Sequence, residues 1–157
     1  MKIRIEAATE KDVPLILRLI ADLAVYEKLP LVTTEEVLRD SLFRKHAAET
    51  FIAYADDEPA GYAMFFQTFS TFLGVPGMYL EDIFVEPRFR RLGIGKMLLT
   101  HLARIAVERG YGRVDWTVLD WNGSAIDFYK TLGAKMLDDW KLCRLTGEPL
   151  RKLADGV

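Results

Sequence analysis

The spacing of apolar residues predicts that the chain begins with a strand followed by two helices. Residues 2–6 alternate polar and apolar side chains, as a half-buried strand does. Thr9 and Asp12 stand three positions apart, which is the spacing of a capping box at the start of a helix. Apolar residues then recur at helical spacing to about Tyr26. A second helix, with a threonine as its cap, is predicted over about 33–43.

The middle of the chain has the alternation and the turn residues of a series of strands. Residues 50–55 and 60–69 are predicted to form a hairpin around an Asp-Asp-Glu-Pro turn. Residues 70–77 are predicted to be a loop, and 78–85 a third strand that Pro87 ends.

The last third of the chain alternates helices and strands. The longest helix is predicted over 94–109, because its apolar residues form one stripe. A strand follows at 113–119, then a helix at 124–132 that ends at Gly133, and a last strand at 140–145. This order predicts an α/β (α+β) protein with a partly parallel sheet and helices on its faces.

Composition narrows the class of protein. The 157 residues fit a single domain, residues 1–157, and half of them are hydrophobic. The net charge of -2 lacks the basic excess of a nucleic-acid-binding protein, so we expect no nucleic-acid partner. One cysteine and two histidines give little support to a disulfide or a metal site. With no long apolar run and no apolar segment near the N-terminus, we expect a cytoplasmic protein with no membrane partner.

The segment 78–97 has the clearest chemistry in the chain. It runs from a strand through a basic turn and two glycines, Gly93 and Gly95, into the longest helix. Helix N-termini have unpaired N–H groups and a partial positive charge, and glycines let a ligand approach the backbone closely. Arg90 and Lys96 add positive charge, so the pattern indicates a phosphate or pyrophosphate site. Alone, however, two glycines before a helix more often form only a turn and a cap.

Two widespread phosphate-binding loops do not fit this segment. A dinucleotide fingerprint needs a third small residue where this chain has Leu98. A P-loop needs Ser or Thr after its lysine, and Met97 follows Lys96.

The remaining pattern, R-x-x-G-x-G between a strand and a helix, resembles the acetyl-CoA signature of the GNAT family of N-acetyltransferases. Residues 121–134 (WNGSAIDFYKTLGA) resemble the last helix of that family. The chain is also similar to the family's diamine (spermidine/spermine) and thialysine acetyltransferase branch, at 26–29, 79–82, 118–122 and 151–154. The resemblance implies a mixed, mostly antiparallel sheet whose parallel central pair splays around acetyl-CoA.

The resemblance implies acetyl-CoA as cosubstrate, with no metal. The residues that match the family's cofactor-binding positions are Ile83, Phe84, Val85, Arg90, Arg91, Leu92, Gly93, Ile94, Gly95, Lys96, Asn122, Phe128 and Tyr129.

The implied reaction is acetyl transfer to a primary amine, which arrives charged because its pKa is about 10.4. Glu81 matches the glutamate that takes the amine's proton through water, and Tyr129 matches the tyrosine that protonates the CoA thiolate. Adjacent strand residues point to opposite faces, so Glu81 and Asp82 are expected to have different roles. The alternatives are salt bridges for the two carboxylates, and an ordinary core face for Phe128 and Tyr129.

The resemblance also implies a site for a small-molecule amine. The residues that match its amine-binding positions are Tyr26, Glu27, Glu81 and Asp82. Polyamine enzymes have an aspartate and a tryptophan where this chain has Ser70 and Phe72, which favours a lysine-like amino acid over a polyamine.

The resemblance implies a homodimer, with 140–145 as an edge strand for the pairing. Other functions remain open at this stage. They are a GNAT enzyme acting on a protein, peptide or aminoglycoside amine, a non-catalytic acyl-CoA-binding module, and a nucleotide-binding protein that uses Gly93 and Gly95.

Overall fold

A computed structural model describes residues 1–156 of the protein. The chain divides into two compact units, Met1–Thr117 and Val118–Val157, and each is described by itself. The assignment of the whole chain to a single domain stays a prediction.

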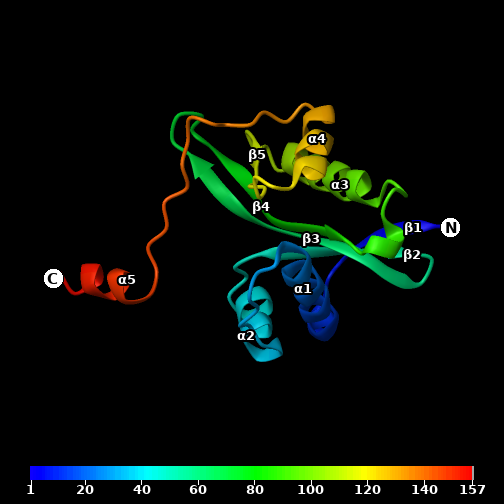
Figure 1. Ribbon diagram of the computed structural model, residues 1–157, viewed down its shortest axis with the longest axis horizontal. Coiled ribbons are helices and arrows are strands. Elements are labelled where there is room, and N and C mark those ends of the chain that lie inside the picture. The colour runs from blue at the N-terminus through cyan, green and yellow to red at the C-terminus, as the bar shows by residue number, and fades with distance from the viewer. Residues whose placement is uncertain (157) are drawn as a thin grey trace. The chain divides into compact units, whose positions relative to one another are not determined.

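The first unit is built on an open five-stranded sheet, in which the strands lie side by side in chain order (Figure 1). They are β1 (Ile3–Ala7), β2 (Glu49–Ala55), β3 (Glu58–Ser70), β4 (Val75–Val85) and β5 (Val114–Asp115). The neighbours from β1 to β4 are antiparallel, and β5 is parallel to β4. The predicted mixed, mostly antiparallel sheet is therefore confirmed, but its parallel pair lies at one edge of the described strands and not at the centre, where it was predicted.

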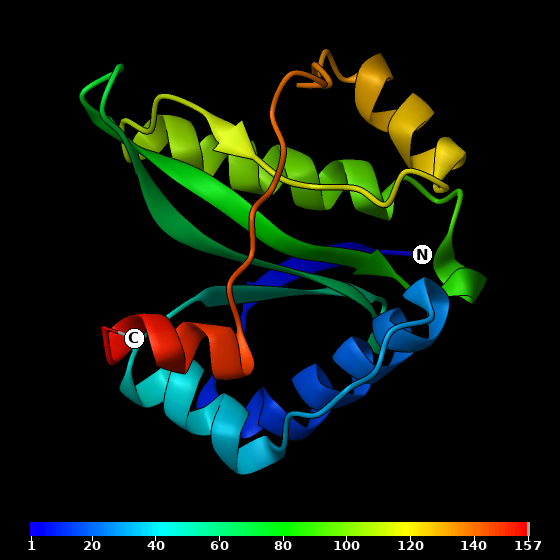
Figure 2. The same ribbon diagram turned by 60° about the vertical axis from the view of Figure 1, so that its left-hand side comes forward.

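Helices cover both faces of this sheet, as predicted (Figure 2). One face is covered by α1 (Val13–Glu27) and α2 (Glu35–Arg39), the latter continued by a π-helical turn, Asp40–Arg44. The other face is covered by α3 (Ile94–Glu108). On the α1 face the core includes Ile16, Leu19, Leu23, Ile52, Tyr62 and Phe84. On the α3 face it includes Phe65, Met78, Leu80, Ile94, Leu98 and Leu102.

Two strand predictions were wrong in extent. The strand predicted at 113–119 is only two residues long, because β4 pairs with it only at Met78 and Tyr79. The loop predicted at 70–77 is instead a short turn at 71–74, since β3 and β4 continue their pairing to Ser70 and Val75.

The helix starts follow the predicted capping chemistry with one shift. The Thr9 N–H donates to Asp12 Oδ2 at 2.7 Å, in a capping box at the one-turn 3-10 helix Glu10–Asp12 that precedes α1. The cap of α2 is Thr34 rather than the predicted Thr33, and Thr34 Oγ1 accepts a hydrogen bond from the Val37 N–H at 3.3 Å.

The second unit contains α4 (Gly123–Thr131) and α5 (Gly147–Ala154). The α4 helix ends as predicted, with Gly133 in the left-handed conformation at φ 89°. The strand predicted at 140–145 does not form, because no described residue of this unit supplies a strand to pair with its backbone. The α5 helix was not predicted.

Candidate functional site

A β-bulge at Glu81 determines which way the β4 side chains point. The register between β3 and β4 shifts between Met64 and Phe65, which leaves Glu81 without a directly opposite residue. Leu80, before the bulge, packs on the α3 face, whereas Phe84, after it, packs on the α1 face. The extra residue thus reverses the face to which alternate side chains point. Of the two carboxylates, Glu81 is exposed and Asp82 is half-buried.

Asp82 is the buried end of a cluster of carboxylates. The fully buried Tyr62 donates a hydrogen bond from its hydroxyl to Asp82 Oδ2 at 3.0 Å. Burial raises the pKa of Asp82 to about 6, against the lowering effect of that hydrogen bond, and the charges of Glu81 and Glu27 raise it further. Burial also raises the pKa of Glu27. A bound cation would relieve this repulsion, so the cluster is suited to an ammonium group.

The turn between β4 and α3 has the backbone geometry of an anion site. Arg91 and Gly93 have positive φ angles of 65° and 80°, and Gly93 is the N-cap of α3. The left-handed conformation at Gly93 is one that L side chains rarely adopt, which explains the glycine there. Gly95 is different, because an added Cβ would meet only ordinary contact, 3.8 Å from Val85 Cγ2.

Three cations predicted to bind the cofactor, Arg90, Arg91 and Lys96, are exposed in this turn and at the start of α3, and Arg90 is held by contacts within the protein. Arg90 Nε donates to the backbone oxygen of Val85 at 2.9 Å. Its guanidinium carbon lies 4.6 Å from the centroid of the Tyr26 ring and 5.7 Å from that of Phe84. Arg90 therefore connects the turn to the end of β4 and to the end of α1. Arg91 and Lys96 are the other two exposed cations.

The structure places the predicted site residues of the first unit on three segments. Tyr26 and Glu27 end α1, residues 81–85 end β4, and 90–96 form the turn and the start of α3. Ile94 is 1% exposed and packs in the core, so only its backbone is available to a ligand.

Three predicted site residues lie in the second unit, on or beside α4. The Asn122 side chain caps the helix by accepting a hydrogen bond from the Ala125 N–H at 3.4 Å. Phe128 and Tyr129 have ring centroids 5.6 Å apart, and Tyr129 is buried.

Sequence reasoning missed Tyr62 and Glu86. Tyr62 lies in an apolar strand, and its hydroxyl gains a role only because the bulge turns Asp82 toward it. Glu86 is a buried carboxylate beside the conspicuous basic turn. The one available signal was a glutamate placed directly between a core strand and Pro87, where burial is expensive without partners.

Across residues 1–156, no three His, Cys, Asp or Glu side chains gather closely enough to hold a metal ion. No helix in that part of the chain has the length and apolar character needed to span a bilayer.

Comparison with known proteins gives similarities over most of the chain. The model of the acetyltransferase (GNAT) family matches residues 17–134. A thialysine N-epsilon-acetyltransferase from Sus scrofa is 39% identical over 96% of this chain and 96% of its own. An L-ornithine N5-acetyltransferase from Arabidopsis thaliana is 35% identical over 96% of this chain and 87% of its own. A solved integron cassette protein from the mobile metagenome of V. cholerae has a TM-score of 0.82 and 29% identity, with 98% of each chain covered.

Proposed function

This chain belongs to the acetyltransferase (GNAT) family, and from that premise we propose that it transfers the acetyl group of acetyl-CoA to a primary amine of a small molecule. One observation carries the proposal: Arg90 connects an anion-binding turn to elements that bear carboxylates. It contacts Val85, which follows Asp82 by three residues on β4, and Tyr26, which precedes Glu27 on α1. A site for an anionic cofactor and a site for a cationic substrate thus meet in one unit.

The turn and the start of α3 fit the pyrophosphate of acetyl-CoA. The first N–H groups of α3 have no partner within the helix, and they follow the left-handed Gly93. Arg91 and Lys96 supply exposed positive charge, while Leu92, Ile94 and Gly95 contribute backbone N–H groups. Bound acetyl-CoA supplies an acyl group activated as a thioester.

The second half of β4 fits the pantetheine arm. Within the first unit, β5 pairs only with Met78 and Tyr79, so this edge of β4 has no strand beside 83–85. An N–H group there is suited to hydrogen-bond the thioester carbonyl and to stabilise the oxyanion that develops on it. For Asn122 and Phe128 we propose a contact with acetyl-CoA on the resemblance to the family alone.

The carboxylate cluster fits the amine. Asp82 and Glu27, with Tyr26, bind the ammonium group, and the exposed Glu81 takes its proton through a water molecule. The neutral amine then attacks the carbonyl directly, and Tyr129 donates a proton to the departing thiolate.

A lysine-like amino acid is the substrate class that we favour over polyamines. Both curated relatives described above are named for amino acids with a side-chain amine, thialysine and ornithine. Ser70 stands where polyamine enzymes have an aspartate, and its hydroxyl is occupied by the Leu73 N–H at 3.2 Å. The position thus offers no carboxylate to a second ammonium group.

The test is release of CoA thiol from acetyl-CoA in the presence of thialysine, lysine, ornithine, putrescine, spermidine or spermine. We expect turnover with at least one amino acid that exceeds turnover with the polyamines, and none in an amine-free control. Turnover with polyamines alone would contradict the substrate class. Silence with every amine, in protein that still melts higher with acetyl-CoA, would favour a peptide or aminoglycoside amine or a non-catalytic module.

The Tyr129→Phe variant tests the proposed acid in the same assay. Loss of a positioned proton donor is expected to lower kcat by about 10²–10⁴-fold. Binding of acetyl-CoA, measured by calorimetry, should remain close to that of the unmodified protein. Near-normal turnover would remove Tyr129 from this role.

A further inference from the structure

Glu86 is a buried carboxylate at the end of β4, where the turn between β4 and α3 (residues 87–93, called the cofactor turn below) begins. Its side chain is only 11% exposed, and it lies one residue before the 3-10 helix Pro87–Phe89 (η3) that begins the turn. Charged side chains are rarely buried to this degree unless they are paired. The residue is outside the set of groups that the proposed reaction uses.

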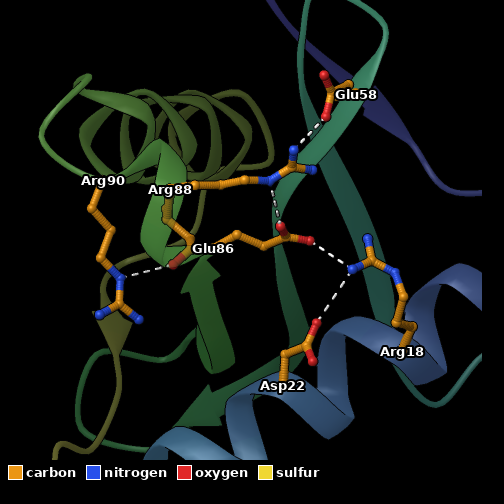
Figure 3. Close-up of polar contacts among 7 residues, drawn as sticks. Arg18, Asp22, Glu58, Glu86, Arg88 and Arg90 are labelled. Carbon is orange, nitrogen blue, oxygen red and sulfur yellow. Dashed lines mark hydrogen bonds and ion pairs between the residues drawn. The ribbon is translucent and has the colours of Figure 1, made fainter.

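Two arginines from different elements pair with Glu86 (Figure 3). Arg18 of α1 donates to Glu86 Oε1 at 2.7 Å, and Arg88 of η3 donates to Oε2 at 3.2 Å. Each arginine also reaches a more exposed carboxylate, since Arg18 lies 3.3 Å from Asp22 and Arg88 lies 2.5 Å from Glu58. Both oxygens of Glu86 are thus occupied, and each arginine is shared between Glu86 and one outer carboxylate.

The backbone of Glu86 is fixed as well as its side chain. Its N–H donates to the Ala60 oxygen of β3 at 2.9 Å, and its own oxygen accepts the Phe89 N–H at 2.9 Å. The first bond anchors the end of β4, and the second closes η3. Glu86 therefore determines where the backbone of the turn that contains Arg90 and Gly93 begins.

The same turn meets α1 at a second point. Arg90 lies over the Tyr26 ring. Tyr26 is eight residues beyond Arg18, and therefore about 12 Å further along α1. The turn is thus attached to the first half of α1 through Glu86 and to its end through Arg90. Neither attachment alone would fix the turn against rotation about its contact.

We propose that Glu86, held by Arg18 and Arg88, is a positioning residue that fixes the cofactor turn against α1, so that the N–H groups at the start of α3 are preorganised for the pyrophosphate. The inference rests on the proposed function, because it takes the turn's ligand to be acetyl-CoA. Glu86 touches no substrate in this role and acts through the backbone of 87–93. Preorganisation of this kind lowers the cost of binding without adding a contact.

The experiment compares Glu86→Gln with the unmodified protein by calorimetric binding of acetyl-CoA and by steady-state kinetics. We expect Kd and KM for acetyl-CoA to rise about tenfold, and kcat to stay within about twofold, because the lost interaction serves binding rather than the chemical step. Matched controls are Asp22→Asn and Glu58→Gln, which remove the outer partner of each arginine and leave Glu86 in place. They should change the acetyl-CoA affinity by less than about twofold.

Arg18→Met removes the ion pair with Glu86 from the α1 side. It provides a second test of the proposal if the Glu86→Gln protein does not fold. It should also weaken acetyl-CoA binding, and the double variant should lose less than the sum of the two single effects, since both act through one pair. A Glu86→Gln protein that melts lower yet binds acetyl-CoA normally would overturn the proposal, as would equal losses in all the variants and controls. Unmodified protein that fails to bind acetyl-CoA would instead overturn the proposed function on which the inference rests.

Discussion

Ionisation of Asp82, within the carboxylate cluster that it forms with Glu81 and Glu27, lowers the stability of the folded protein. Asp82 is half-buried beside the fully buried Tyr62, with the negative charges of Glu81 and Glu27 acting on it. The hydrogen bond from Tyr62 offsets only part of this cost, because the pKa of Asp82 still lies at about 6. A site that binds an ammonium group is expected to store such repulsion in its empty state, since the substrate then relieves it.

Asp82→Asn should therefore stabilise the protein, by an amount that depends on pH. The pKa of Asp82 is about 6 in the folded protein, above its usual value of 3.8, so ionisation opposes folding. The penalty is absent below the unfolded pKa, grows as pH rises toward 6, and is complete above the folded pKa. Urea unfolding at pH 8 should show the variant more stable by on the order of 2 kcal/mol, and at pH 5, between the two pKa values, about half of this gain should remain.

The control for this prediction is Asp127→Asn, which removes an exposed carboxylate. Its unfolding free energy should follow that of the unmodified protein across the same pH range, within about 0.5 kcal/mol. An Asp82→Asn protein that is no more stable at pH 8 than at pH 5, relative to the unmodified chain, would contradict the assignment of a raised pKa.

At the scale of elements, the pair of strands β3 and β4 sets the geometry of the site. Their register shift places the bulge at Glu81, and a close approach at Gly61 brings β3 against the end of β4. A Cβ on Gly61 would lie 2.3 Å from the Phe84 oxygen and 3.1 Å from Val85 Cα. Both neighbours are backbone atoms, so neither can move away without displacing the strand that is proposed to bind pantetheine.

Gly61→Ala is accordingly expected to destabilise the protein by about 1–3 kcal/mol through overpacking. Chemical unfolding would measure it. Gly123→Ala is the matched control, because a Cβ there meets nothing within 4 Å, and it should shift stability by no more than about 0.5 kcal/mol. An equal effect in the two variants would mean that the contact with β4 is not the cause.

The elements themselves were largely predictable from sequence, whereas their irregularities were not. The long helix over 94–108 follows from one apolar stripe, and β2 and β3 follow from their alternation. The bulge at Glu81 leaves no local signal, because it arises from the register between two strands that pair across a turn. The hydrogen bond from Tyr62 to Asp82 could not be predicted either, because it depends on the same register. The strand predicted at 140–145 had a suitable pattern but no described partner strand in its unit.

At the scale of the whole molecule, the second unit exposes more apolar surface than a solitary unit would be expected to leave in water. Its exposed large apolar side chains include Leu137, Trp140, Leu142, Leu145, Leu150 and Leu153. Large apolar side chains left exposed along one segment are suited to burial against a partner. We propose on this ground that a second copy of the chain covers residues 137–153.

The expected solution mass is therefore about twice the 17.9 kDa of one chain, as measured by light scattering on a sizing column. Replacing Trp140 and Leu142, which are 77% and 73% exposed, with glutamate should shift the protein to the monomer. The control is a double glutamate replacement at Val25 and Val107, which are 80% and 79% exposed in the first unit. A monomer before any substitution, at concentrations of about 0.1 mM, would contradict the dimer.

The short pairing of β5 with β4 has a consequence for how the protein behaves in a cell. Within the first unit, β5 pairs only with Met78 and Tyr79, and the Gly112 N–H donates to the Pro76 oxygen, so beyond Tyr79 no strand of that unit pairs with this edge of β4. Such an edge is a template for pairing with another chain, and its last three residues, 83–85, are apolar. The bulge twists the strand, and a cofactor lying along it would block the same groups. Acetyl-CoA would then act as a protective ligand as well as a substrate, and the supply of acetyl-CoA would limit how much of the protein stays dispersed.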